Sequence, residues 1–241
     1  MGETLVEMKN IYKKFGEVYA LKGVDFVIKR NEIVGLVGDN GAGKSTLIKI
    51  LSGIYLADKG EIYFKGRRVH INSPKDAMKL GIETIHQDQA LVNEMSVARN
   101  IFMGRELTKT LHLLDKKKMR EKSMEILTDI GLHLKSPDIN VKSLSGGERQ
   151  GIAIARAMHF NAKILVMDEP TTALSIREAQ KILQFIKQLR NSGVSCVFIT
   201  HNLHHVYPVA DRFTILSHGR KINDIMKKDT SIEKLEQLIM K

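Results

Sequence analysis

The chain has 241 residues, a net charge of +11 and 43% hydrophobic residues. This apolar content supports a packed interior and excludes an intrinsically disordered protein. Aromatic residues make up only 5% and tryptophan is absent, so the sequence offers few platforms for stacking nucleic-acid bases. Apolar runs stay well below the roughly 20 residues of a membrane-spanning helix. Met1–Leu5 does not resemble the start of a signal peptide, and we expect a cytoplasmic protein.

Strands and turns alternate over the first third of the chain. Leu5–Met8 and Val24–Ile28 favour half-buried strands. Glu32–Val37 is almost entirely apolar and indicates a buried strand that enters a glycine loop. We expect a helix over Lys44–Leu51, and Ser73–Pro74 is typical of the start of another helix.

The loop after the buried strand, Gly38–Ser45, has the pattern Gly-x-x-x-x-Gly-Lys-Ser. Phosphates need several backbone N–H donors with no side chains in the way, which glycines permit. The following helix adds the positive end of its dipole. Lys44 supplies a positive charge to the phosphates, and the Ser45 hydroxyl can be a ligand of Mg²⁺. We therefore predict that ATP and Mg²⁺ are the cofactors. The predicted nucleotide-binding residues of this loop are Gly38, Asp39, Asn40, Gly41, Ala42, Gly43, Lys44, Ser45 and Thr46.

Strand patterns disappear from about Glu94 to Phe160, and helical patterns replace them. The basic run Lys116–Lys118 lies among apolar residues at helical spacing, which indicates the exposed face of an amphipathic helix. Alternation of strands and helices then resumes, which implies a mostly parallel sheet covered by helices. We expect strands at Ile164–Met167, Ser195–Ile199 and Phe213–Leu216, and helices that begin near Ser175, Asn202 and Ser231. Cys196 lies in an apolar stretch, and we expect it to be a small buried residue.

Two carboxylates, Asp168 and Glu169, follow the strand Ile164–Met167. Ligands of open α/β sheets bind at the C-terminal ends of the strands. We predict that Asp168 holds Mg²⁺ through water and that Glu169 is the base, or orients the water, for attack on the γ-phosphate. The alternative is a solvated acidic turn, which the nearby phosphate loop disfavours.

A second candidate phosphate site is the helix start at Ser145–Glu148. Ser145 and Glu148 fit a capping box, which is the purely structural explanation. Glycine is a poor helix former, so two glycines in the first turn weaken the helix. A cap needs neither Gly146 nor Gly147. The two glycines favour close approach of an anion to the helix N-terminus. One monomeric site does not account for two such helix starts.

The order of these motifs resembles that of ATP-binding cassette (ABC) ATPases. The phosphate loop, Leu144–Gln150 (Leu-Ser-Gly-Gly-Glu-Arg-Gln), Asp168–Glu169 and Thr200–His201 carry the resemblance, which covers nearly the whole chain. It implies an α/β phosphate-loop fold with a mixed sheet flanked by helices and an antiparallel N-terminal β-subdomain. It also implies a single domain, 1–241, with a catalytic core at about 1–87 and 160–241 and an inserted helical subdomain at about 88–159.

The resemblance assigns three further roles. Phe15 matches the aromatic residue that stacks on adenine, Gln87 the glutamine that senses Mg²⁺ and the attacking water, and His201 the histidine that contacts the γ-phosphate. On their own, these residues would be taken for a core aromatic residue, a loop residue and a polar strand end. The family also implies a head-to-tail dimer. Each ATP then lies between one phosphate loop and the Ser145, Gly146, Gly147 and Glu148 of the other copy.

Asn40–Tyr55 and Ser96–Glu106 are similar to monosaccharide importers of the ribose, xylose and fructose type. This implies a peripheral subunit at the cytoplasmic face of the inner membrane, with transmembrane permease partners and, indirectly, a solute-binding protein. Nucleic acid is not expected. The alternatives are an importer for a non-sugar solute, a soluble ABC ATPase of ribosomes or nucleic acid, which only the charge supports, and a regulatory cassette without turnover, which Glu169 and His201 disfavour. Ser175, where many cassettes have Asp, forms a capping pattern with Glu178.

Overall fold

The computed structural model describes residues 2–86, 90–172 and 174–240. Its strands are β1 (Thr4–Phe15), β2 (Val18–Lys29), β3 (Ile33–Val37), β4 (Lys59–Phe64), β5 (Arg67–Val69), β6 (Ile82–Ile85), β7 (Ile164–Asp168), β8 (Ser195–Ile199), β9 (Arg212–Ser217) and β10 (Arg220–Met226). Its α-helices are α1 (Lys44–Leu51), α2 (Pro74–Leu80), α3 (Val97–Phe102), α4 (Lys116–Asp129), α5 (Gly146–His159), α6 (Ile176–Asn191), α7 (Leu203–Val206) and α8 (Ile232–Ile239). Short 3₁₀ turns lie at Thr110–His112, Val141–Ser143 and Lys227–Asp229.

The strands form two sheets. The smaller sheet is antiparallel, in the order β2-β1-β4-β5, and the larger one has the order β10-β9-β3-β8-β7-β6. In the larger sheet all neighbours are parallel except β10, which pairs antiparallel with β9. The predicted α/β fold, with a mixed sheet, flanking helices and an antiparallel N-terminal sheet, is therefore confirmed.

The larger sheet is buried on both faces. Val34, Leu36 and Val197 point into a core shared with α1 and the small sheet. The alternate residues Ile33, Cys196 and Phe198 point into a second core with α5 and α6. Parallel strands covered on both faces read as continuous apolar runs, which is why β3, β7 and β8 were recognisable in the sequence. Cys196 is fully buried as expected, and burial raises the pKa of its thiol to about 12.

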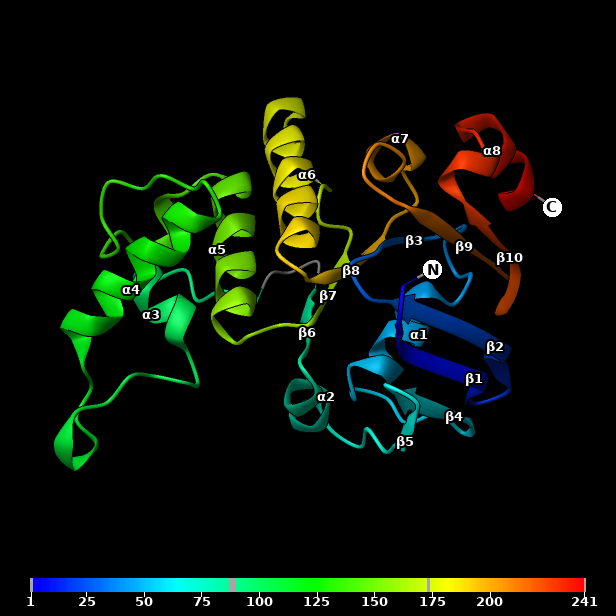
Figure 1. Ribbon diagram of the computed structural model, residues 1–241, viewed down its shortest axis with the longest axis horizontal. Coiled ribbons are helices and arrows are strands. Elements are labelled where there is room, and N and C mark those ends of the chain that lie inside the picture. The colour runs from blue at the N-terminus through cyan, green and yellow to red at the C-terminus, as the bar shows by residue number, and fades with distance from the viewer. Residues whose placement is uncertain (1, 87–89, 173, 241) are drawn as a thin grey trace.

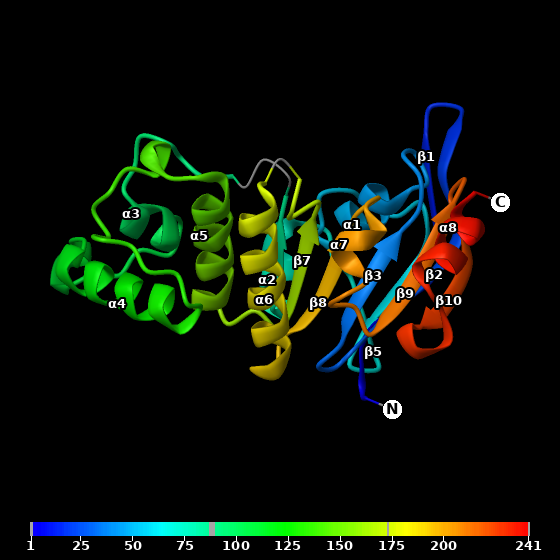
Figure 2. The same ribbon diagram turned by 90° about the horizontal axis from the view of Figure 1, so that it is seen from above.

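Helices α3, α4 and α5 gather at one end of the molecule, beyond β6 and α6, and the small sheet lies at the other end (Figures 1 and 2). The amphipathic helix predicted around Lys116–Lys118 is confirmed as α4, which buries Met119, Ser123 and Leu127. No helix within residues 2–86, 90–172 and 174–240 is both long and apolar enough to cross a membrane.

The sequence underestimated the first two strands and missed four others. β1 and β2 extend to a tight turn where Phe15 pairs with Val18. The outer parts of this hairpin are mostly exposed or half-buried and carry charged residues, so they lack the apolar pattern of a strand. The strands β4, β5, β6 and β10 are short or polar, so their own sequences carry no clear strand pattern. Each is recognised only by its hydrogen bonds to a neighbouring strand. The helix expected from Asn202 is a single turn, α7.

A buried arginine joins the two sheets. Arg212, at the start of β9, bonds the Glu32 carboxylate with Nε at 2.8 Å and Nη2 at 2.9 Å. The same Nη2 donates to the Val27 carbonyl oxygen in β2, and Nη1 donates to Asp224 in β10. The side chains of Arg212 and Glu32 are only 5% and 8% exposed, so neither charge can turn to water instead.

Replacing Arg212 with Leu should lower the free energy of unfolding by about 3–5 kcal/mol, because Glu32 would keep a buried charge without its partner. Chemical denaturation monitored by circular dichroism measures this change. The control is Arg220→Leu in β10, whose guanidinium only reaches the Lys22 carbonyl oxygen at 3.5 Å. It should change stability by less than about 0.5 kcal/mol. Equal effects of the two variants would contradict the role given to Arg212.

Candidate functional site

The loop between β3 and α1 can form only with glycine at two of its positions. Gly38 has φ 147°, and a Cβ there would lie 2.1 Å from the Leu216 carbonyl oxygen. Gly43, the N-cap of α1, has φ 101°, and its Cβ would lie 2.7 Å from the Ala20 carbonyl oxygen. Gly41 has φ 80° and faces open space. The chain therefore wraps tightly and presents its backbone, as phosphate binding requires.

Lys44 is the first residue of α1 and is buried. Its ammonium donates to the carbonyl oxygens of Gly38 at 2.6 Å and Asp39 at 2.8 Å. Burial lowers the pKa of Lys44, and the nearby charges of Glu169 and Asp168 oppose that shift. The loop thus holds a cation at its centre.

Ser45 and Asp168 come together from different elements. Asp168 ends β7, and the Ser45 hydroxyl, from the first turn of α1, hydrogen-bonds its carboxylate. Burial and the charge of Glu169 raise the pKa of Asp168, while His86 and Lys49 lower it. A hydroxyl and a carboxylate oxygen are ligands that Mg²⁺ accepts beside phosphates and water, so the pair fits this ion.

Glu169 accepts hydrogen bonds from several groups. It has φ 51°, unusual for a residue with a side chain. Its Oε1 accepts from the His201 backbone N–H at 3.1 Å and lies 2.7 Å from Nδ1 of the same residue. Its Oε2 accepts from the hydroxyls of Thr200 at 2.9 Å and Thr172 at 3.1 Å. Thr172 carried no signal in the sequence, and Thr200 stood there only as the residue before His201, with no role of its own.

These side chains surround a pocket of about 510 Å³. Phe15 lies at its edge, 42% exposed, with its ring 5.2 Å from that of Tyr55. Gly38 and Asp39 do not line the pocket, because their carbonyl groups face Lys44 at the base of the loop. The lining residues are Phe15, Val18, Tyr19, Ala20, Asn40, Gly41, Ala42, Gly43, Lys44, Ser45, Thr46, Asp168, Glu169, Thr172, Ile199 and His201. Val18 and Tyr19 carried no signal in the sequence.

The helix start at Ser145 lies elsewhere. Both views separate α5 from α1, with α6 and β7 between them (Figures 1 and 2). Among the described residues, the lining of the phosphate-loop pocket includes none of Ser145, Gly146, Gly147 and Glu148. The capping box is present: Ser145 Oγ accepts from the Glu148 N–H at 3.3 Å, and Glu148 Oε2 accepts from the Ser145 N–H at 2.8 Å. Gln87 lies outside the described residues.

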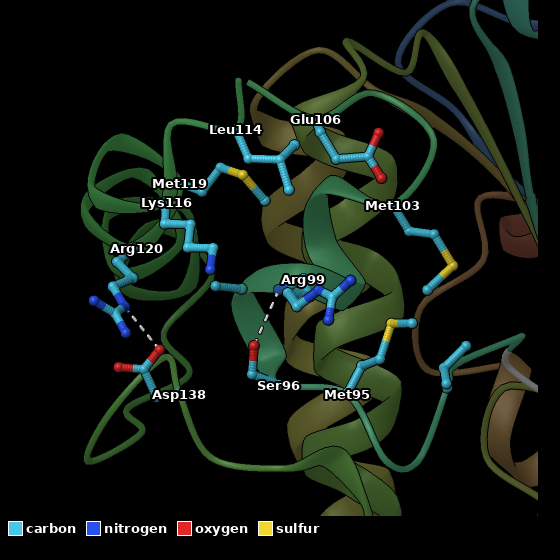
Figure 3. Close-up of a pocket in the computed structure, with 12 residues that line it drawn as sticks. Met95, Ser96, Arg99, Met103, Glu106, Leu114, Lys116, Met119, Arg120 and Asp138 are labelled. Atoms are coloured by element: carbon cyan, nitrogen blue, oxygen red, sulfur yellow. Dashed lines mark hydrogen bonds and ion pairs between the residues drawn. The ribbon is translucent and has the colours of Figure 1, made fainter. Parts of the chain in front are cut away.

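A second pocket, of about 530 Å³, lies among α3, α4 and the segments that join them (Figure 3). Met95, Met103, Leu114 and Met119 supply apolar surface, and Leu114 is 44% exposed. Arg99 and Lys116 also line this pocket. Beside them, Arg120 bonds Asp138 at 2.8 Å. Glu106 lines it as well, so this surface is hydrophobic with charges of both signs around it, basic ones in slight excess.

A glycine loop before a helix, and two carboxylates at the C-terminal end of a parallel strand in the same sheet, define a phosphate-loop ATPase. The family model described as "ABC transporter" matches residues 21–172. The chain therefore belongs to the ABC transporter family, as an ATP-binding subunit that hydrolyses ATP.

Sequence relatives include the xylose/arabinose import ATP-binding protein XylG of Sulfolobus acidocaldarius. It is 47% identical over 237 residues, which cover 98% of this chain and 93% of that protein. The ribose import ATP-binding protein RbsA of Caldanaerobacter subterraneus is 46% identical, covering 90% of this chain and 44% of the relative. RbsA 2 of Escherichia coli O157:H7 is 41% identical, with coverage of 98% and 46%. The chain thus spans about half the length of these ribose relatives.

Solved structures of ABC cassettes have the same fold. A nucleotide-free ATP-binding cassette from an ABC transporter superimposes with a TM-score of 0.85 at 27% identity, covering 99% of this chain and 96% of that chain. The cassette MJ0796, in a dimeric post-hydrolysis state bound to ADP and Pi, has a TM-score of 0.79 at 27% identity, with coverage of 94% and 100%.

Glu169→Gln should slow ATP hydrolysis by roughly 10²- to 10⁴-fold, the usual contribution of a general base, and leave ATP binding intact. Phosphate release and binding of a fluorescent ATP analogue measure the two effects. Lys44→Ala provides the contrast, since it removes positive charge from the loop and should weaken binding itself. Near-normal hydrolysis by Glu169→Gln would remove Glu169 from the chemistry.

Proposed function

We propose that this chain powers the import of a monosaccharide as the ATPase subunit of a membrane transporter. The observation that carries this proposal is its 47% identity to a xylose/arabinose import ATP-binding protein over nearly the full length of both chains. The chain would bind peripherally at the cytoplasmic face of the inner membrane, next to permease subunits that form the pore. A solute-binding protein would deliver the sugar from the other side.

The site supports specific roles for its residues. The phosphate loop and Lys44 would hold the β- and γ-phosphates, and Phe15 would stack on adenine. Ser45 and Asp168, with Gln87, would hold Mg²⁺, which neutralises phosphate charge when bound. Glu169 would orient the attacking water and take its proton, and His201 would contact the γ-phosphate. His201 Nδ1 lies 2.7 Å from Glu169 Oε1, so contact with the γ-phosphate would require the His201 side chain to turn away from Glu169.

We further propose one cassette domain, with a core at about 1–87 and 160–241 and a helical subdomain at about 88–159. Two copies would pair head to tail, so that Ser145, Gly146, Gly147 and Glu148 of one chain complete the pocket of the other. The separation of α5 from the phosphate loop within one chain supports this arrangement.

Ser145→Arg should abolish ATP-driven dimerisation and leave ATP binding by the monomer largely unchanged, because a bulky cation would block the helix start that faces the partner's nucleotide. Size-exclusion chromatography in the Glu169→Gln background, with and without ATP, measures dimer formation. Loss of nucleotide binding by the monomer would mean that Ser145 acts within its own chain.

The pocket between α3 and α4 is our candidate docking surface for the permease. Its methionines can adapt to a partner's apolar side chains, and Arg99 and Lys116 complement an acidic residue. An amphipathic permease helix with an acidic residue has both features.

To test the function, the chain is co-expressed with the permease encoded by its neighbouring genes and purified from membranes. We expect a stable complex whose ATPase activity in liposomes rises with a sugar-loaded binding protein. Leu114→Glu should disrupt the complex but keep ATP binding, because it places a charge in the apolar pocket. The control is Ile222→Glu on β10, equally exposed and outside that pocket. Stimulation only by a non-sugar solute, or by RNA without a permease, would contradict the proposal.

A further inference from the structure

The start of α5 is packed closely against the start of α6. A Cβ at Gly147 would lie 2.9 Å from Cβ and Cγ of Glu178, and one at Gly146 would lie 2.9 Å from Leu174 Cδ2. The stem of Glu178 therefore leaves no room for a side chain at Gly147, whereas at Gly146 only the tip of the Leu174 side chain would have to move. Within this chain, the carboxylate of Glu178 lies at the helix start where we expect a phosphate of the partner's ATP.

Glu178 bridges the two helix starts. Its Oε1 accepts from the backbone N–H of Gly147 in the first turn of α5 at 3.1 Å. Its Oε2 accepts from the backbone N–H of Ser175 at 3.0 Å and from the Ser175 hydroxyl at 2.8 Å. The Ser175 hydroxyl and N–H and then the Gly147 N–H lower the pKa of Glu178 to about 2. The side chain is therefore an anion at any working pH.

The stretch of chain that leads into α6 and carries Glu178 begins at Glu169. Glu169 accepts a hydrogen bond from Thr172, and the chain then passes through Ser175, the N-cap of α6, to Glu178. Glu178 and the turn that begins at Glu169 therefore belong to one short stretch of the chain. A pocket of about 360 Å³ next to these groups is lined by Ser145, Gly147, Glu178 and Lys181. Lys181, one turn further along α6, offers a cation toward which a displaced carboxylate can turn.

We propose that Glu178 is a positioning residue of the two-copy site. Within one chain its carboxylate accepts the hydrogen bond of the Gly147 N–H. When the two copies pair, a phosphate of the ATP bound by the second copy has to take the place of that carboxylate. This inference rests on the proposed head-to-tail dimer. One N–H cannot serve two anions, and a carboxylate next to a phosphate repels it. Glu178 therefore opposes dimer formation until ATP supplies a stronger anion.

Glu178→Gln tests this role. The amide keeps the size of the side chain but removes its charge, so ATP no longer has to displace an anion from α5. In the Glu169→Gln background, the ATP concentration that gives half-maximal dimer should fall by about 2- to 30-fold, the range expected for one charge at a helix terminus. ATP binding by the monomer should not change. The stability of the variant should fall slightly, because α6 loses part of its cap.

A purely structural role predicts the opposite sign for dimerisation. If Glu178 only fastens α6, the variant should lose stability and dimerise less readily. The charge control is Glu125→Gln, an exposed residue on α4, which should leave the ATP dependence of dimerisation unchanged. Glu178→Asp keeps the charge but shortens the side chain, so it should lie between the parent and Glu178→Gln. It also serves as the second variant if Glu178→Gln does not fold.

The outcomes separate this inference from the proposed function. If the ATP concentration that gives half-maximal dimer is unchanged or higher in Glu178→Gln, the role of Glu178 is overturned and the two-copy site stays intact. Absence of ATP-driven dimers in the parent and in all variants overturns the two-copy site, and with it this inference. If this ATP concentration also falls in Glu125→Gln, the effect comes from net charge alone, and the role of Glu178 is overturned.

Discussion

The parallel pairing of β3, β8 and β7 is the constraint on which the site depends. Leu36 in β3 and Asp168 in β7 both lie opposite Ile199 in β8. Consequently the phosphate loop, the carboxylates of Asp168 and Glu169, and the pair Thr200–His201 leave the sheet at one edge. Because apolar residues fill both faces of these strands, a shift of register would misplace an entire core. Packing in the two cores thus sets the distances among these groups.

At this edge the chain adopts conformations that most residues avoid. Gly38, Gly43 and Glu169 all have positive φ, and Glu169 does so with a side chain. Hydrogen bonds from Thr172, Thr200 and His201 fix the Glu169 carboxylate in place. The buried strands on either side hold this geometry. The ammonium of Lys44 is held within the loop by the carbonyl oxygens of Gly38 and Asp39.

The two candidate phosphate sites of one chain are separate in space but connected through the backbone. The segment after Glu169 leads directly to Glu178, and Glu178 contacts the start of α5. Under the proposed dimer, one short stretch would therefore lie between Glu169 of its own site and the helix start that completes the partner's site. The α3–α4 pocket lies at the same end of the molecule as α5, so permease binding and nucleotide binding would both act on this group of helices.

The sequence by itself determined the phosphate loop, the strand that ends in Asp168 and Glu169, the capped starts of α5 and α6, and the α/β fold. Glycine spacing, continuous apolar runs and capping residues are local signals, so they survive without knowledge of the neighbours. Only the tertiary structure decided that Thr172 and Thr200 hold Glu169, that Tyr19 lines the pocket, and that β4, β5, β6 and β10 are strands. It also decided that the anion at Gly147 is Glu178, because that contact joins residues 31 positions apart, which no local pattern can specify.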